Sequence, residues 1–196
     1  MKKLKARLFS LDLKERANTI GAEYKEGTLT IPILGKPFSI DRNSNITTDI
    51  HVNNWVLGSA LHYINYSKGV PLNSNWVPLR ELPSGKDWYR LFGQQCENIL
   101  KATADKYPDL FSDLVAMFRG TLVDDQCQSD VAVILSPLPL VPMLICYWRP
   151  EDGMESSLNL FFDDTAETNI GMEGLYTLGV GIALMLERLS LVHGDN

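Results

Sequence analysis

VAVILSPLPLVPMLICYW, residues 131–148, decides the fold. It contains two apolar runs rich in β-branched and aromatic residues, and a proline-rich segment divides them. Short apolar runs bounded by turn residues are typical of buried strands. We therefore expect strands over 130–135 and 141–148, joined by a turn at 137–140, and a further strand at 157–162.

A long closing helix is expected over 171–190, because apolar residues recur there at helical spacing. Gly174, Gly179 and Gly181 fall inside this helix, although each glycine lowers helix stability by up to about 1 kcal/mol relative to alanine. We infer that another backbone approaches the helix closely at these positions.

The first two-thirds of the chain combine β-prone runs with amphipathic helical patterns. Thr47, Thr48 and Asp49 are suited to cap a helix. Pro32 cannot donate to a β ladder, so its strand should lie at a sheet edge or carry a bulge. The expected elements are a helix over 3–18, a hairpin of strands 28–34 and 37–41 around Gly35-Lys36, and helices over 49–67, 84–104 and 108–118.

The order of these elements indicates the fold class. A hairpin, several helices, three strands and a closing helix are typical of an α+β fold with a mainly antiparallel sheet, here with about five helices. The chain has 196 residues and no long linker, which predicts one domain over 1–196.

The net charge is −6, from 18 basic and 24 acidic residues. Nucleic acids and anionic membranes select basic surfaces, so we expect neither as a partner. The basic start of the chain is followed too soon by charged residues between Asp12 and Arg16 for a signal peptide. The longest apolar stretch, 131–148, is interrupted by prolines and should not span a membrane. We expect a cytoplasmic protein.

Cysteines and histidines are few and widely spaced. No Cys-x-x-Cys pair or histidine pair has the spacing of a zinc or iron–sulfur site, so we expect reduced, mostly buried thiols and no metal site. These residues are Cys96, Cys127, Cys146, His51, His62 and His193.

Two acidic pairs flank the last two strands. Glu151-Asp152 and Asp163-Asp164 could hold a cation or perform acid–base chemistry. In a hairpin, however, they would lie at opposite ends, about 20 Å apart, so one shared site is not expected. The spacing from Asp164 to Glu167 also fits a helix cap. The candidate catalytic residues are Asp163, Asp164 and Glu151.

Aromatic and proline residues suggest a binding groove as an alternative to a plain core. Trp76, Pro142 and Trp148, together with Asp163, could receive a flat small molecule or a peptide. These four are the candidate ligand-binding residues.

Several short motifs occur together in one family. They resemble the domain of unknown function 3786, a family of bacterial and archaeal proteins frequent in anaerobes, over about residues 15–190. Some members carry an N-terminal cysteine segment thought to bind an iron–sulfur cluster, but no cysteine precedes Cys96 here, so that cofactor is not carried over. The segment after Trp148 departs from the family pattern, which weakens a role for Glu151. The shared motifs are His62–Ile64, Gly69–Leu72, Trp76-Val77, Glu81–Gly85, Pro139–Pro142, Tyr147-Trp148, Leu160–Asp163 and the helix opening near Glu173.

Three functions are compatible with these observations. The first is non-catalytic binding of a small molecule or cofactor, in anaerobic metabolism if the resemblance holds. The second is a protein-interaction or oligomeric scaffold that uses edge strand 28–34 or the proline-rich loop. The third is a carboxylate-based enzyme with Asp163 as base or metal ligand.

Overall fold

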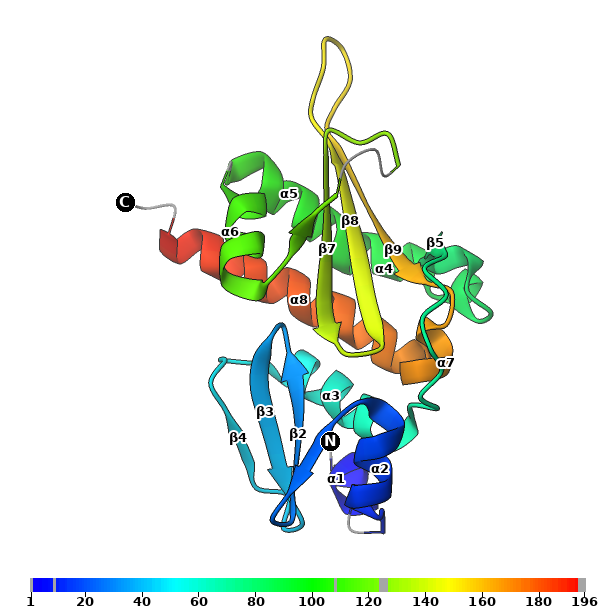
Figure 1. The fold of residues 1–196 in the computed structure, drawn as a ribbon. Helices are drawn as coiled ribbons and strands as arrows, with labels where there is room; N and C mark the ends of the chain where they lie inside the picture. Colours follow the sequence, from blue (N-terminus) through cyan, green and yellow to red (C-terminus); the bar gives the residue numbers. More distant parts are fainter. Residues whose placement is uncertain (1, 9, 108, 124–126, 194–196) are drawn as a thin grey trace.

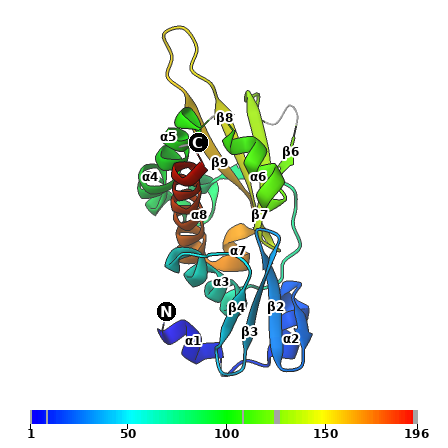
Figure 2. The same ribbon diagram turned by 90° about the vertical axis from the view of Figure 1, so that its left-hand side faces the viewer.

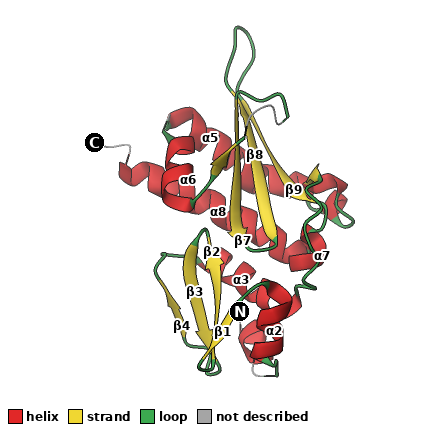
Figure 3. Cartoon of the chain, viewed as in Figure 1, coloured by secondary structure: helices red, strands yellow, loops and turns green. Residues whose placement is uncertain are grey.

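The computed structural model describes residues 2–8, 10–107, 109–123 and 127–193. It contains two antiparallel sheets, one built from the N-terminal part of the chain and one from the later strands (Figure 1). The expected α+β class is confirmed, but the hairpin and the late strands belong to separate sheets. Figure 3 shows the helices grouped around both sheets.

The first sheet has the strand order β1-β2-β3-β4. The expected hairpin forms its centre, with Pro32 opposite Pro37. Strand β1 pairs only with the start of β2, so Pro32 lies where its strand has no second neighbour, which fits its missing N–H. Strand β1 therefore covers the first half of the edge expected along 28–34 but not the second half. The strands are β1 (Glu23–Lys25), β2 (Thr28–Ile33), β3 (Lys36–Asp41) and β4 (Ile46–Thr48).

The turn between β2 and β3 is Leu34-Gly35, one residue earlier than expected. Both residues have positive φ angles, 50° at Leu34 and 75° at Gly35. Two such residues form the two-residue turn that matches the twist of a hairpin. Leu34 tolerates the left-handed conformation because its side chain is buried and its N–H donates to the carbonyl of Pro137 in the second sheet.

The second sheet has the order β5-β9-β8-β7-β6 and confirms the three expected late strands. Its turn is only Pro139-Leu140, because β7 continues past a bulge between Leu135 and Leu138. Strands β5 and β6 were not expected from the sequence, since each is very short. The strands are β5 (Trp76–Pro78), β6 (Thr121–Leu122), β7 (Val131–Leu138), β8 (Val141–Trp148) and β9 (Ser157–Asp163).

Helices cover one face of the second sheet. Figure 2 shows α4, α5 and α8 on the same side of β7–β9. The helices are α1 (Lys2–Leu8), α2 (Leu13–Ile20), α3 (Asn54–Tyr66), α4 (Tyr89–Phe92), α5 (Asn98–Lys106), α6 (Leu110–Phe118), α7 (Ala166–Ile170) and α8 (Met172–His193). Short 3₁₀ turns lie at Leu79–Glu81 and Gly85–Asp87, and a π-helical turn, Gly93–Glu97, connects α4 to α5.

The bounds of three expected helices are wrong. The pattern over 3–18 is broken because the carboxylate of Asp12 accepts hydrogen bonds from the N–H groups of Lys14 and Glu15, which begins a second helix. The helix expected from 49 begins at Asn54, because Asn53 caps it while Thr47 and Thr48 pair in β4. The helix expected over 84–104 is also interrupted: Ser84 makes no side-chain cap, α4 begins at Tyr89, and the π-helical turn separates α4 from α5. Pro108 lies outside the described residues.

Helix α8 is the central element of the core, and α3 packs along it. A Cβ built on Gly181 would lie 2.8 Å from the backbone nitrogen of Val56, so the expected close approach of a backbone is confirmed there. At Gly174 and Gly179 the close neighbours are side chains instead. One continuous cluster of buried apolar residues spans both sheets and these helices.

One described helix is long and apolar enough to cross a membrane, contrary to expectation. It comprises Met172–Leu191 of α8, and 56% of its most apolar window is buried inside the structure. The core helix of a folded domain meets the same test of length and composition. The cytoplasmic location stays a prediction.

Candidate functional site

A cleft of about 480 Å³ lies where the first sheet meets the C-terminal halves of α6 and α8. Four separate segments contribute to it: the β2–β3 hairpin, the loop after β4, the end of α6 and the last turns of α8. We name it the inter-sheet cleft and define it by its lining residues. They are Lys36, Asp49, Ile50, His51, Ala116, Met117, Phe118, Met185, Arg188 and Leu189.

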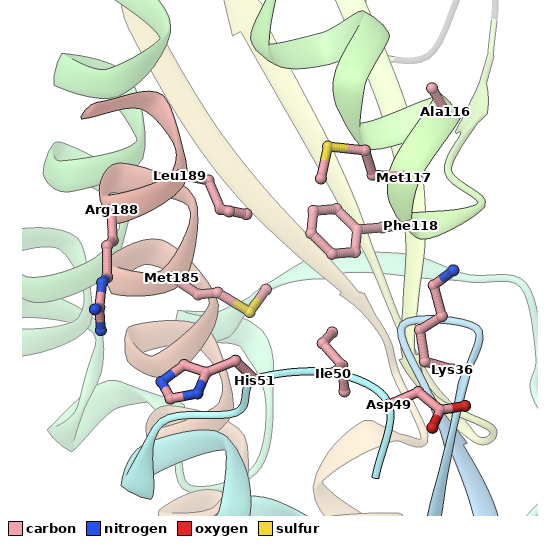
Figure 4. Close-up of a pocket in the computed structure, with 10 residues that line it drawn as sticks. All are labelled: Lys36, Asp49, Ile50, His51, Ala116, Met117, Phe118, Met185, Arg188 and Leu189. Atoms are coloured by element: carbon pink, nitrogen blue, oxygen red, sulfur yellow. The ribbon is translucent and has the colours of Figure 1, made fainter. Parts of the chain in front are cut away.

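The centre of the inter-sheet cleft is apolar. Figure 4 shows the side chains of Met117, Phe118, Met185, Leu189 and Ile50 directed toward one another across it. Phe118 and Met185 are buried, whereas Met117 is 38% exposed at the mouth. Methionine is flexible and polarisable, so two methionines allow the cleft to adapt to apolar groups of different shape.

Charged and polar side chains occupy the two ends of the inter-sheet cleft. Lys36 and Asp49 lie at one end, and His51 and Arg188 at the other (Figure 4). Among the residues that the structure describes, neither Lys36 nor Arg188 has an ion-pair partner. The two ends of the cleft thus carry two cationic side chains and one carboxylate, so their local charge is positive although the protein as a whole is acidic.

The loop that carries Asp49 and His51 is fixed to α8 by Asn53. Its side-chain oxygen accepts hydrogen bonds from the N–H groups of Trp55 and Val56 in the first turn of α3, both at 3.0 Å. Its Nδ2 donates to the carbonyl of Gly181 at 2.8 Å. One side chain therefore caps α3 and holds the cleft loop beside the α8 segment that carries Met185.

The opposite wall is fixed by the end of α6. Arg119 follows Phe118 in the left-handed conformation and ends the helix. Its side chain lies against the hairpin turn, because a Cβ built on Gly35 would be 2.7 Å from the Cδ of Arg119. Only glycine accommodates both this contact and the positive φ angle, and the contact places Lys36 beside the end of α6.

A second hollow of about 360 Å³ continues the inter-sheet cleft along α8. The two share His51, Met185 and Arg188. The additional residues are Asn53, Asn54, Trp55 and Leu184. Trp55 is 41% exposed, so an apolar group that leaves the cleft past His51 meets an accessible aromatic surface.

Asp163, the first catalytic candidate, is buried and fully engaged. Its two carboxylate oxygens accept hydrogen bonds from the N–H groups of Asn73, Ser74 and Thr165 and from the Thr165 hydroxyl. Burial acts to raise the pKa of Asp163, but these hydrogen bonds outweigh it and hold the pKa below the usual value. The carboxylate therefore stays ionised and anchors the loop before β5.

Asp164 is not the expected helix cap. The residue that precedes α7 is Thr165, without a side-chain cap. Asp164 instead accepts hydrogen bonds from the side-chain amides of Asn73 and Asn75, at 2.8 and 3.0 Å. The capping prediction is wrong because the neighbouring polar loop supplies donors that the local spacing could not reveal.

Side chains alternate between the two faces of a sheet along each strand. The registers of β5, β8 and β9 therefore place the four candidate ligand-binding residues on one face, the face opposite the helices. Trp76 pairs with Asp163 at one end of β9, whereas Trp148 pairs with Ser157 at the other. Pro142 is buried. The structure therefore brings Trp76 and Asp163 together and leaves Trp148 apart.

Trp148 lines a separate polar hollow of about 370 Å³, which Glu151 shares. Glu151 forms a bridge with Met154 in the loop beyond β8, at the end of the hairpin opposite Asp163, as the spacing predicted. Trp76, Pro142 and Asp163 line neither this hollow nor the inter-sheet cleft.

The inter-sheet cleft was not found from the sequence, because its residues come from distant segments. His51 was assigned to a helix but lies in the loop before α3. One local feature could have indicated the cleft: Met117 is an apolar residue on the polar side of an otherwise amphipathic helix. In the described part of the chain, no three His, Cys, Asp or Glu residues lie together as a metal site.

The model of one protein family matches residues 12–185, most of the chain, and its description is domain of unknown function DUF3786. The chain belongs to this family. The DUF3786 match includes all the lining residues of the inter-sheet cleft except Arg188 and Leu189. No curated protein and no solved structure matches the chain.

Proposed function

We propose that this DUF3786 protein binds a small molecule without catalysing a reaction, and that the ligand carries an apolar body and an anionic group. The observation that supports this proposal is the apolar centre of the inter-sheet cleft between Lys36 and Arg188, which lack ion-pair partners among the described residues. Ligand pockets in proteins are mostly apolar, with a few polar groups that set orientation.

The anionic group follows from charge. A protein with a net charge of −6 repels anions at long range, so an anion binds only where local cations face it. Arg188 offers a planar guanidinium, which can bind a carboxylate through two parallel hydrogen bonds. Asp49 near Lys36 disfavours an anion at the other end, so we place the anionic group beside Arg188 and the apolar body over Phe118.

The alternatives have weaker support. A carboxylate-based enzyme would need a free acid or base, but Asp163 is saturated by hydrogen bonds. An interaction scaffold that uses strand 28–34 loses part of its edge to β1. A link to anaerobic metabolism rests on the family resemblance and stays a prediction.

Thermal unfolding with octanoate as probe tests the proposal. We expect the melting temperature to rise progressively with octanoate concentration, by about 2–4 °C per kcal/mol of stabilisation, because octanoate binds only the folded state. Octanamide, which has the same chain and no charge, should give a smaller rise. The substitution Arg188→Gln should abolish the difference between the two probes.

Two further variants make the test specific. Arg90→Gln removes an exposed arginine outside the cleft and should leave the octanoate response unchanged. Met117→Glu places a carboxylate at the cleft mouth and should suppress the response without unfolding the protein, since Met117 is exposed. An equal octanoate shift in wild type, Arg188→Gln and Met117→Glu would overturn the proposal.

A further inference from the structure

Two cysteines that lie far from the inter-sheet cleft are brought together by the β7–β8 hairpin. Cys146 lies near the end of β8, buried on the sheet face opposite the helices, in a small cluster with Ala132 and Leu144. Cys127 lies in the turn before β7 and is exposed. Cys127 lies near enough to Cys146 for its thiol, through a side-chain hydrogen bond, to contribute to the raised pKa of Cys146.

The backbone holds the two cysteines near each other. The carbonyl of Gln128, the residue after Cys127, accepts a 2.9 Å hydrogen bond from the indole Nε1 of Trp148. Asp130 accepts a 2.7 Å hydrogen bond from the N–H of Arg149. The backbone of the turn is therefore held beside the end of β8 at two points close to Cys127.

We propose that Cys127 and Cys146 form a thiol–disulfide modification site that is oxidised by a hydroperoxide. The Cys127 thiolate attacks one oxygen of hydrogen peroxide and the O–O bond breaks. The leaving hydroxide takes up the proton that the thiol released, so Cys127 sulfenic acid and one water form. The Cys146 sulfur then attacks the sulfenic sulfur and expels its hydroxyl group, which leaves with the thiol proton as water. Two thiols and one peroxide thus give one disulfide and two waters.

The different exposure of the two cysteines indicates which of them reacts with the peroxide first. Cys127 is accessible to a dissolved oxidant, whereas Cys146 is buried. Burial, and then the neighbouring Cys127 thiol, raise the pKa of Cys146, which makes it a poor first nucleophile. Its position near Cys127 supplies the proximity that the second step needs. Cys96 is buried among core residues and serves as an internal reference for a thiol that does not react.

The site is read out by treating the full chain with a small excess of hydrogen peroxide, then unfolding and alkylating the protein. Relative to the untreated and alkylated protein, we expect the intact mass to be lower by two alkyl groups and a peptide map to join Cys127 to Cys146. Dithiothreitol added before alkylation should reverse both changes. Cys96 should be fully alkylated throughout. The disulfide involves no cleft residue, so it should form whether or not octanoate binds.

Two variants separate the steps. Cys127→Ser changes an exposed position, so the protein should fold and lose the mass change completely. Cys146→Ala should leave Cys127 as a sulfenic acid that dimedone traps. Dimedone-labelled Cys127 in wild type beside a freely alkylated Cys146, or disulfide-linked dimers in place of the internal bond, would overturn the proposal.

Discussion

Asp163 accepts a 2.7 Å hydrogen bond from the backbone N–H of Ser74, 89 residues earlier in the chain. Ser74 has a φ angle of 58°, which is uncommon for a residue with a side chain. The carboxylate at the end of β9 thus stabilises a left-handed turn in the polar loop that leads into β5. This contact gives Asp163, a candidate catalytic residue by its sequence, a structural role in the loop before β5.

Asp163→Asn should destabilise the protein by about 1.5–3 kcal/mol, the typical value for hydrogen bonds to a charged group. The amide nitrogen would face N–H donors that now point at a carboxylate oxygen. Urea unfolding measures the change. Asp152→Asn, at an exposed position, is the matched control and should lie within about 0.5 kcal/mol of wild type.

The contribution of Asp163 should disappear in acid. Its pKa in the folded protein lies below the value of about 3.9 expected in the unfolded chain, so the folded state favours the ionised form. The stabilisation is present above that pH and is lost as the pH falls through the folded pKa. Urea unfolding of wild type and Asp163→Asn at a series of pH values should show two curves that converge below about pH 4. A constant gap down to pH 2 would contradict the assignment.

Gly181→Ala and Gly93→Ala should change stability in opposite directions. Alanine favours a helix over glycine by about 1 kcal/mol, so propensity alone predicts a gain at both sites. At Gly181 the new Cβ would meet the backbone of Val56 at 2.8 Å, and we expect a net loss of about 1–3 kcal/mol. At Gly93, which is helical, the nearest atom is 3.5 Å away, an ordinary contact. A gain at both positions in thermal unfolding would mean that α3 can move away from α8.

Elements with long periodic patterns could be predicted from the sequence. Strands β7, β8 and β9 and helix α8 each carry enough apolar residues to show their period, and all four were found. Strand β5 was missed because three residues have no readable period, and their strand conformation comes from pairing with β9. The break before α2 and the start of α3 depend on the Asp12 and Asn53 caps, where several polar residues competed for the role.

The site could not be predicted to the same extent. The inter-sheet cleft draws Lys36, His51, Met117 and Arg188 from four segments, and only the packing of α6 and α8 against the first sheet places them together. The proximity of Cys127 to Cys146 was equally hidden, since cysteine spacing gives no sign that the turn before β7 lies beside the end of β8. The pair Asp163-Asp164 was visible in the sequence, but the hydrogen-bond donors that engage it were not.

Asn169→Asp should be among the most destabilising single-atom changes in the protein. Asn169 is fully buried in α7 and holds two segments of the chain, because its Nδ2 donates to the carbonyls of Val70 and Leu140. Its side-chain oxygen accepts from the N–H of Val70 at 2.9 Å. An aspartate would direct an oxygen at both carbonyls and bury an unpaired charge, at a cost of about 3–5 kcal/mol.

Urea unfolding at several pH values distinguishes this mechanism from a general loss of packing. The neutral acid restores one donor, so the loss at Asn169→Asp should shrink as the pH falls and the buried carboxylate takes up a proton. Asn159→Asp makes the same change at an exposed position of β9 and should be nearly neutral at every pH. If Asn169→Asp matches Asn159→Asp at pH 7, then Asn169 does not hold the Val70 loop to the β7–β8 turn.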